Sequence, residues 1–186
     1  MNKLKHIEVI KDIYKQGGNL IEYLKKLDNN DINDTESILI SYDFQAGSYI
    51  KFAETQKDYF DKYTTAIETV INKLGSYNSI MEVGVGEATV MVPLVKKLIS
   101  RNRNLKMLGF DISWSRISFA KKYSSKHNVQ INLFTGNLFN IPLPDNSVDI
   151  VYTSHSLEPN GGKEKQALEE LYRVASKYIV LLEPSY

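Results

Sequence analysis

Apolar residues in the first part of the chain recur at helical spacing, and farther along they form short runs separated by helical segments. Two stretches, residues 4–14 and 20–27, each place their apolar side chains on one face of a predicted helix. A short helix is expected at about residues 35–41. A longer one is expected from about 48 to 74, where Gly75 ends it. The chain therefore begins with a helical segment.

From residue 75 onward the pattern alternates between short apolar runs and helical stretches. The expected strands cover residues 79–83, 106–111, 129–134, 148–153 and 177–183, and the expected helices cover 87–101, 114–126 and 162–175. Strands separated by helices predict a parallel sheet with right-handed crossovers. The predicted fold class is α/β, a doubly wound and mostly parallel sheet with an N-terminal helical extension. We divide the chain into an extension or cap at residues 1–47 and a ligand-binding domain at 48–186.

The turn after the first predicted strand carries the most chemical information. Glu82 ends the strand, and Gly84 and Gly86 form a tight turn before a helix. Such glycines let the backbone approach a ligand closely, and the helix directs N–H groups at it. A dinucleotide-binding loop has a third glycine, which is missing here. The carboxylates of Glu82 and Glu87 disfavour a pyrophosphate and suit a ligand that carries a cationic amine and a sulfonium. Taken alone, the loop also fits an ordinary tight turn.

An acidic residue, Asp111, ends the second predicted strand. A carboxylate in this place accepts hydrogen bonds from the two hydroxyls of a ribose. The alternative role is that of a helix N-cap, which Ser113 could supply equally well. We favour the ribose role.

Several spaced motifs occur in one order along residues 75–184, and together they resemble class I S-adenosylmethionine-dependent methyltransferases. The nearest resemblance is to the small-molecule branch that includes the ubiquinone-type C-methyltransferases. The family pattern is an ExGxGxG loop, an acid after strand two, a G(D/N)hxxhPhxDxSaD segment and a strand that ends near Ser-His-xx-Glu. The matching residues are Glu82, Gly84, Gly86, Asp111, Gly136, Asn137, Leu138, Pro142, Asp145, Ser147, Asp149, Ser154, His155 and Glu158.

The resemblance implies an S-adenosylmethionine site at the carboxyl ends of the strands, with S-adenosylhomocysteine as the product. The implied cofactor-binding residues are Glu82, Gly84, Gly86, Asp111, Ile112, Asn137, Leu138, Thr153 and Tyr49. Ile112 packs on the adenine, and Asn137 and the Leu138 backbone bind its edge. Asn137 replaces the more usual aspartate but keeps an oxygen that accepts from the exocyclic amine. Its alternative role is that of a simple loop residue.

The segment after the fourth predicted strand should face the methyl acceptor. Histidine is a common general base, so His155 could deprotonate an acceptor hydroxyl, and Glu158 could assist or bind a cationic or hydroxylated substrate. Alternatively, His155 only orients the loop through a hydrogen bond. Tyr59 and Tyr63 lie at helical spacing and are interpreted as packing residues.

Composition narrows the function further. The chain has 186 residues, 42% of them hydrophobic, a net charge of +1 and no cysteine. A chain of this length and composition can bury one hydrophobic core. With so small a net charge it has no broad electrostatic field that would attract nucleic acid or an anionic membrane. Disulfides, thiolate zinc sites and a cysteine nucleophile are excluded. No bilayer-spanning run or signal-peptide core is seen, so we expect a cytoplasmic protein that binds a small-molecule acceptor, with no nucleic acid, membrane or metal partner.

Family members usually continue beyond the fifth strand, whereas this sequence stops there. We expect either that the sequence is a fragment of a longer protein, with the C-terminal strands of the family absent, or that the edge of strand five is covered by the N-terminal helices, by a second copy in a homodimer or by a partner chain. The predicted function is S-adenosylmethionine-dependent methyl transfer to a small or medium-sized metabolite. The alternative is a cofactor-binding module that is non-catalytic or depends on a partner. A third hypothesis is another enzyme on this fold, an aminopropyltransferase or a nucleotide-linked oxidoreductase.

Overall fold

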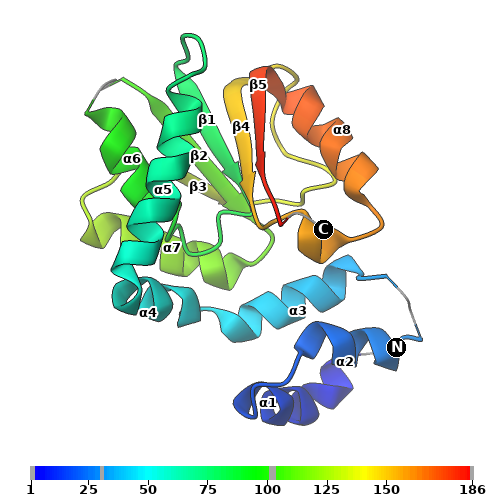
Figure 1. The fold of residues 1–186 in the computed structure, drawn as a ribbon. Coiled ribbons are helices and arrows are strands. Elements are labelled where there is room, and N and C mark those ends of the chain that lie inside the picture. The colour runs from blue at the N-terminus through cyan, green and yellow to red at the C-terminus, as the bar shows by residue number, and fades with distance from the viewer. Residues whose placement is uncertain (1–2, 30–31, 101–103, 185–186) are drawn as a thin grey trace.

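A five-stranded sheet forms the centre of the computed structural model, which describes residues 3–29, 32–100 and 104–184 (Figure 1). The strands are β1 (Ser79–Val83), β2 (Lys106–Asp111), β3 (Asn132–Thr135), β4 (Val148–Ser154) and β5 (Ala175–Leu182). All paired strands are parallel, in the order β3-β2-β1-β4-β5. The strand order reverses at β1, and ligands of such sheets bind at this switch point. The predicted α/β fold class is confirmed.

Helices cover both faces of the sheet and its carboxyl end (Figure 1). The helices of the sheet domain are α5 (Lys57–Ile71), α6 (Met91–Ile99), α7 (Trp114–Lys126) and α8 (Glu164–Val174), with the 3-10 turn η2 (Glu158–Asn160). The N-terminal elements are η1 (Lys3–His6), α1 (Ile7–Lys15), α2 (Leu20–Leu27), α3 (Thr35–Gln45) and α4 (Ser48–Thr55). Figure 1 places α1 to α4 under the carboxyl ends of the strands and not beside β5, so they do not cover that edge.

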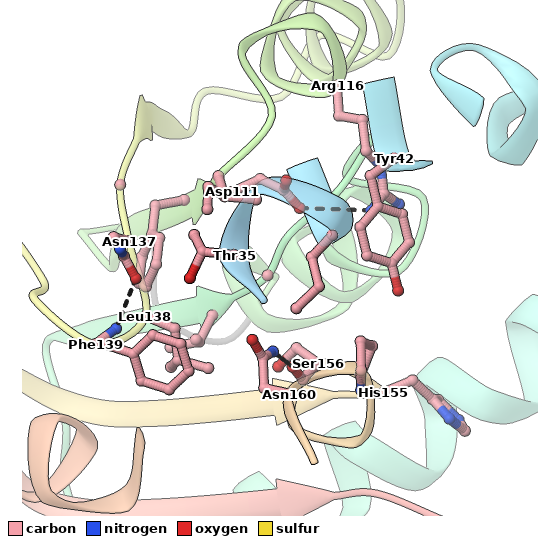
Figure 2. Close-up of a pocket in the computed structure, with 17 residues that line it drawn as sticks. Thr35, Tyr42, Asp111, Arg116, Asn137, Leu138, Phe139, His155, Ser156 and Asn160 are labelled. Carbon is pink, nitrogen blue, oxygen red and sulfur yellow. Dashed lines mark hydrogen bonds and ion pairs between the residues drawn. The ribbon is translucent and has the colours of Figure 1, made fainter. Parts of the chain in front are cut away.

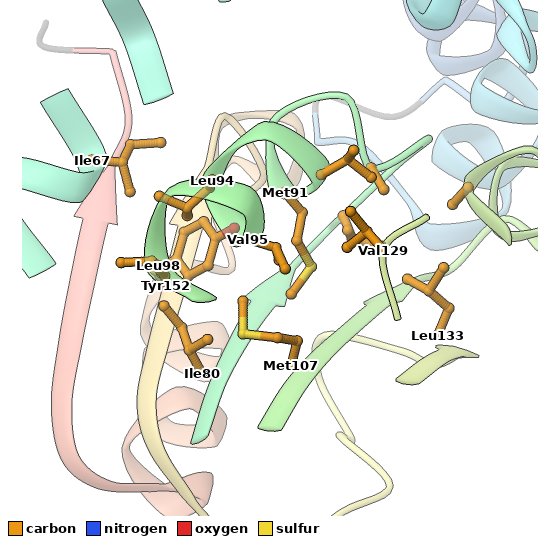
Figure 3. Close-up of a cluster of buried hydrophobic side chains, with 14 of the residues drawn as sticks. Ile67, Ile80, Met91, Leu94, Val95, Leu98, Met107, Val129, Leu133 and Tyr152 are labelled. Carbon is orange, nitrogen blue, oxygen red and sulfur yellow. The ribbon is translucent and has the colours of Figure 1, made fainter. Parts of the chain in front are cut away.

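The main core lies between the sheet and the helices α5, α6 and α7 (Figure 3). Ile80 of β1 and Leu94 of α6 are fully buried there, and each such side chain contributes about 1.5–3 kcal/mol through the hydrophobic effect. Successive strand residues point to opposite faces. Met81 therefore packs on the other face, in a second cluster that includes Leu171 of α8.

The N-terminal helices have a small core of their own, formed by Ile10, Leu20 and Leu24. The buried Lys3 amino group reinforces it, because its Nζ lies 2.7 Å from an Asp28 oxygen and 2.9 Å from an Asp34 oxygen. These ion pairs join the start of the chain to the start of α3.

The predicted single helix at 48–74 is wrong, because the chain breaks at Gln56 into α4 and α5. Gln56 has φ −112° and ψ 44°, and its N–H donates to Phe52 O at 2.9 Å, which ends α4. The break lets the rings of Phe52 and Phe60 pack edge to face with centroids 5.8 Å apart.

Two predicted boundaries also shift. The helix predicted from 87 begins at Met91, because Ala88 has φ 60° and is not helical; its predicted end at 101 lies outside the described residues. The third strand begins at Asn132 and not at 129, because the Val129 N–H donates to Ser124 O at 3.0 Å and so completes the turn that ends α7. Within the described residues, no helix has both the length and the apolar character needed to cross a membrane.

Candidate active site

The glycine loop between β1 and α6 lies at the switch point of the sheet. Gly84 and Gly86 have φ of 68° and 53°, in the left-handed region that favours glycine. A Cβ on Gly84 would lie 2.5 Å from the Cβ of Ser156, and one on Gly86 would lie 2.2 Å from Nη2 of Arg116. Both the backbone conformation and the available space therefore require glycine at these two positions.

Asp111 fastens this loop to the end of β2. Its Oδ2 accepts a hydrogen bond from the Gly86 N–H at 2.9 Å, and its Oδ1 accepts one from the Ser113 N–H at 2.9 Å. The N-cap of α7 is Ser113, whose Oγ accepts from the Arg116 N–H at 3.0 Å. The side chain of Asp111 is thus not the helix cap, and it lines a cavity beside the loop.

Arg116, in the first turn of α7, is a residue of this site that the sequence analysis missed. Its side chain is buried, and Nη1 lies 3.6 Å from Oδ2 of Asp111. The guanidinium carbon lies 4.8 Å from the ring centroid of Tyr42 and 4.9 Å from that of Tyr49. A basic residue five positions after the strand-end acid was the available signal, but the two tyrosines come from segments far away in the sequence.

Glu82 lies next to the end of β1 and is buried. Its Oε2 accepts a hydrogen bond from the Tyr152 O–H at 2.8 Å. Burial is the largest influence on this carboxyl and raises its pKa to about 8, although the hydrogen bond and the charge of Arg116 act in the opposite direction. Glu82 is therefore mostly protonated at neutral pH.

Glu87 does not face a ligand, and the prediction that its carboxylate would do so is wrong. Its Oε1 accepts from the Gly47 N–H and its Oε2 from the Ile50 N–H, both at 2.8 Å. These partners are 40 and 37 residues away along the chain, so no local pattern indicates them. Glu87 joins the glycine loop to the start of α4.

A narrow cavity of about 70 Å³ extends from the glycine loop past Asp111 (Figure 2). Ile112, Asn137 and Leu138 line its far side. Oδ1 of Asn137 accepts from the Phe139 N–H at 2.9 Å, so this oxygen already stabilises its own loop. Helix α3 closes the cavity with Thr35, Ile38 and Tyr42.

A second, wider cavity of about 360 Å³ lies on the other side of the loop and is walled by aromatic rings. The rings belong to Tyr42, Tyr49, Phe52, Tyr59, Phe60 and Tyr63. Tyr59 and Tyr63 stack with centroids 6.2 Å apart, as their predicted packing role requires, and Tyr59 is 54% exposed beside this cavity. Gly84, Arg116 and His155 line both cavities, which therefore meet at the glycine loop.

The loop after β4 places His155 and Glu158 at this junction. His155 is exposed, has φ 53°, and its N–H donates to Leu182 O at 3.0 Å. Glu183, which the sequence analysis missed, holds the loop: its carboxylate accepts from the N–H groups of Ser156 at 3.1 Å, Leu157 at 3.2 Å and Glu158 at 3.4 Å.

The structure thus brings most of the predicted site residues to one end of the sheet. Gly84, Asp111, Ile112, Asn137 and Leu138 line the narrow cavity, while Glu82, Gly84, Tyr49, His155 and Glu158 line the aromatic one. Gly86 contacts Asp111 from within the loop. Thr153 is fully buried and does not line either cavity, and its Oγ1 has no hydrogen-bond partner among the described residues.

The family model of the methyltransferase domain matches residues 80–177, from β1 into β5. The chain belongs to this family. It is a class I S-adenosylmethionine-dependent methyltransferase domain, and the cofactor of the family is S-adenosylmethionine.

One curated relative is also a methyltransferase. An uncharacterized methyltransferase of Anoxybacillus flavithermus is 28% identical over 113 residues, which are 61% of this chain and 48% of the relative. The chain thus spans about half the length of the curated relative that it matches.

Solved structures share the fold. A candidate S-adenosylmethionine-dependent methyltransferase of Methanococcus maripaludis has a TM-score of 0.62 at 21% identity, over 75% of this chain and 63% of that one. A complex between the Haloferax volcanii Trm112 methyltransferase activator and a candidate methyltransferase has a TM-score of 0.54 at 18% identity, over 72% of this chain and 55% of that one.

Proposed function

We propose that this domain transfers the methyl group of S-adenosylmethionine to a small or medium-sized metabolite. The observation that carries this proposal is the meeting of two different cavities at one glycine loop. One cavity extends past a strand-end carboxylate, and the other is wide and aromatic. A methyltransferase needs such an arrangement, because the methyl donor and the acceptor must enter from different sides. The acceptor nucleophile, the methyl group and the sulfur can then lie in line.

The residues of the narrow cavity fit an adenosine and a methionine group. Gly84 and Gly86 let Ser156 and Arg116 approach the loop closely, and the buried Ser156 Oγ at this loop has no hydrogen-bond partner among the described residues. In our proposal Glu82 and the two glycines hold the methionine half and Asp111 holds the ribose.

The adenine in this proposal lies against the remaining predicted residues. Ile112 packs on the ring, and Asn137 and the Leu138 backbone bind its edge. Tyr49 covers the methionine end from α4. We retain Thr153 only as a support of the site from within β4, because its side chain is buried behind both cavities.

The chain's contribution to catalysis is mainly orientation. The bound cofactor supplies an activated methyl group on a sulfonium, and positioning of two reactants can contribute about 7–11 kcal/mol to lowering a barrier. The aromatic walls exclude water and orient the acceptor. His155 removes a proton where the acceptor is a hydroxyl, and Glu158 assists or binds the acceptor.

A partner-dependent module is the second candidate function, and one observation favours it. A structural neighbour is a complex of a methyltransferase activator with a candidate methyltransferase. In this version a second copy or another chain covers β5. Residues 1–47 act as a cap over the cavities in both versions.

Calorimetric titration tests the proposal first, with S-adenosylmethionine, S-adenosylhomocysteine and NAD as a control. We expect saturable binding of the first two ligands alone. Asp111→Ala should weaken that binding by about tenfold or more, since hydrogen bonds to a charged group contribute about 1.5–3 kcal/mol. Binding of NAD alone would contradict the proposal. Transfer of labelled methyl groups to a metabolite extract then separates the enzyme from the non-catalytic module.

A further inference from the structure

Arg116 is the one described cation that both cavities share, and its charge is only partly matched within the protein. The side chain is buried, yet its Nε has no hydrogen-bond partner among the described residues. Its Nη1 lies 3.6 Å from Asp111 Oδ2, which is an ion pair but longer than a hydrogen bond. A buried donor without an acceptor is costly, so its presence at a cavity indicates a ligand that accepts.

The neighbouring acids leave the hydrogen-bond donors of this guanidinium available. Asp111 carries the opposite charge, but its oxygens accept hydrogen bonds from the backbone N–H groups of Gly86 and Ser113, and it lies 3.6 Å from Arg116 Nη1. Glu82 accepts from the Tyr152 O–H, and burial raises its pKa to about 8. A ligand with acceptor oxygens can therefore bind to Arg116 beside this ion pair.

The rings around Arg116 fix its orientation. Tyr42 and Tyr49 stack on the guanidinium at 4.8 and 4.9 Å, and Nη2 lies so close to the glycine loop that a Cβ on Gly86 would be 2.2 Å away. Contact with these rings holds the guanidinium in place, while its N–H donors lie in its own plane and stay outside the ring contacts. A planar carboxylate matches these donors with two parallel hydrogen bonds.

We propose that Arg116 is the carboxylate-binding residue of this site. The carboxylate belongs either to the methionine half of the cofactor or to the methyl acceptor, since Arg116 faces both cavities. The inference rests on the proposed function and names a residue that the family motifs do not include.

Ligands that differ only in the carboxylate test this inference. S-adenosylmethionine and decarboxylated S-adenosylmethionine are titrated into the wild-type chain, Arg116→Met, Arg116→Lys and the control Lys121→Met, an exposed cation on the same helix. If the cofactor supplies the carboxylate, Arg116→Met should weaken binding of the carboxylated ligand by about 10- to 100-fold and leave the decarboxylated one nearly unchanged. Arg116→Lys keeps the charge and should lie between wild type and Arg116→Met, and Lys121→Met should behave as wild type.

A second titration tests whether the methyl acceptor supplies the carboxylate. Phenylacetate, an aromatic carboxylate, is titrated into the free chain and into its S-adenosylhomocysteine complex. If the acceptor supplies the carboxylate, Arg116→Met should abolish phenylacetate binding and leave cofactor affinity unchanged. Equal weakening of both sulfonium ligands, together with unaltered phenylacetate binding, would overturn the proposal. Circular dichroism verifies folding, and Arg116→Lys decides the matter if the methionine variant does not fold.

The two proposals fail in different ways. Absence of any S-adenosylmethionine binding to a folded wild-type chain counts against the proposed function. The phenylacetate titration of the free chain still tests Arg116 in that case.

Discussion

Glu82 keeps its proton at neutral pH because burial opposes ionisation, and this affects the stability of the whole domain. Its pKa is about 8 in the folded chain against an ordinary value of 4.5. Above about pH 4.5 the unfolded chain releases this proton while the folded chain retains it. The unfolded state then binds fewer protons than the folded one, so the contribution of Glu82 to stability falls as the pH rises toward 8.

Glu82→Gln should remove that pH dependence, because glutamine still accepts the Tyr152 O–H and does not ionise. Urea unfolding between about pH 5 and 8 measures it. We expect the wild type to lose stability relative to the variant as the pH rises. Glu169→Gln, at a surface ion pair, should keep the wild-type slope. Parallel curves for wild type and Glu82→Gln would show that the group ionises normally.

His155→Asn tests the proposed base without straining the loop, since asparagine tolerates the positive φ of 53°. Turnover of a hydroxyl acceptor should fall by about 10²- to 10⁴-fold, the usual contribution of a general base. Cofactor affinity should stay the same. The readouts are single-turnover kinetics and calorimetry. A full rate in the variant would assign His155 to loop orientation only.

The local sequence was enough to predict those site residues that lie in or beside a turn at the end of a strand. Gly84, Gly86 and Asp111 were recognisable because each lies at a strand end. The partners of Glu87, Arg116 and Glu183 were not recognisable, since they come from other segments: Gly47 lies 40 residues from Glu87 and Ser156 lies 27 residues from Glu183. Contacts over such distances are set by the fold.

The helices and strands also divide into those that local sequence predicts and those that depend on distant contacts. The five strands and the helices between them were predicted by their periodicity, because each buries one apolar face. The break at Gln56 was missed, because α4 and α5 share a continuous helical pattern and no glycine or proline marks the bend. The start of α6 was misplaced because Ala88 has φ 60°, a conformation that is uncommon for a residue other than glycine and that its residue type does not indicate.

Helix α4 depends on the glycine loop through Glu87. Glu87→Ala leaves the N–H groups of Gly47 and Ile50 without this acceptor and should destabilise the domain by about 2 kcal/mol. Cofactor affinity should also fall, because α4 carries Tyr49 over Arg116. Glu54→Ala is the matched control on the same helix, since its exposed ion pair with Lys126 contributes less than about 1 kcal/mol. Urea unfolding and titration measure both effects, and equal results for the two variants would refute the coupling.

At the scale of the whole molecule, the N-terminal helices and the sheet domain form the two walls of one site. Helix α3 lies over the narrow cavity, and Asn33 Nδ2 donates to Pro159 O at 2.8 Å, which connects the extension to the loop after β4. The sequence predicted a helical extension or cap, but not that Thr35 and Ile38 of α3 would line the cavity. Amphipathic faces show that a helix packs, and not which partner it packs against.

The sheet edge at β5 leads to the last prediction. Among the described residues β5 pairs with β4 on one side only, and Leu181 is 47% exposed on it. Such an edge promotes strand pairing with another chain. Leu181→Lys should therefore reduce self-association in sedimentation velocity at rising concentration. Tyr172→Lys, which removes a 72% exposed ring from α8, should not. If both variants reduce self-association equally, general surface hydrophobicity and not the β5 edge drives it. If neither does, the edge is not an interface between copies of this chain.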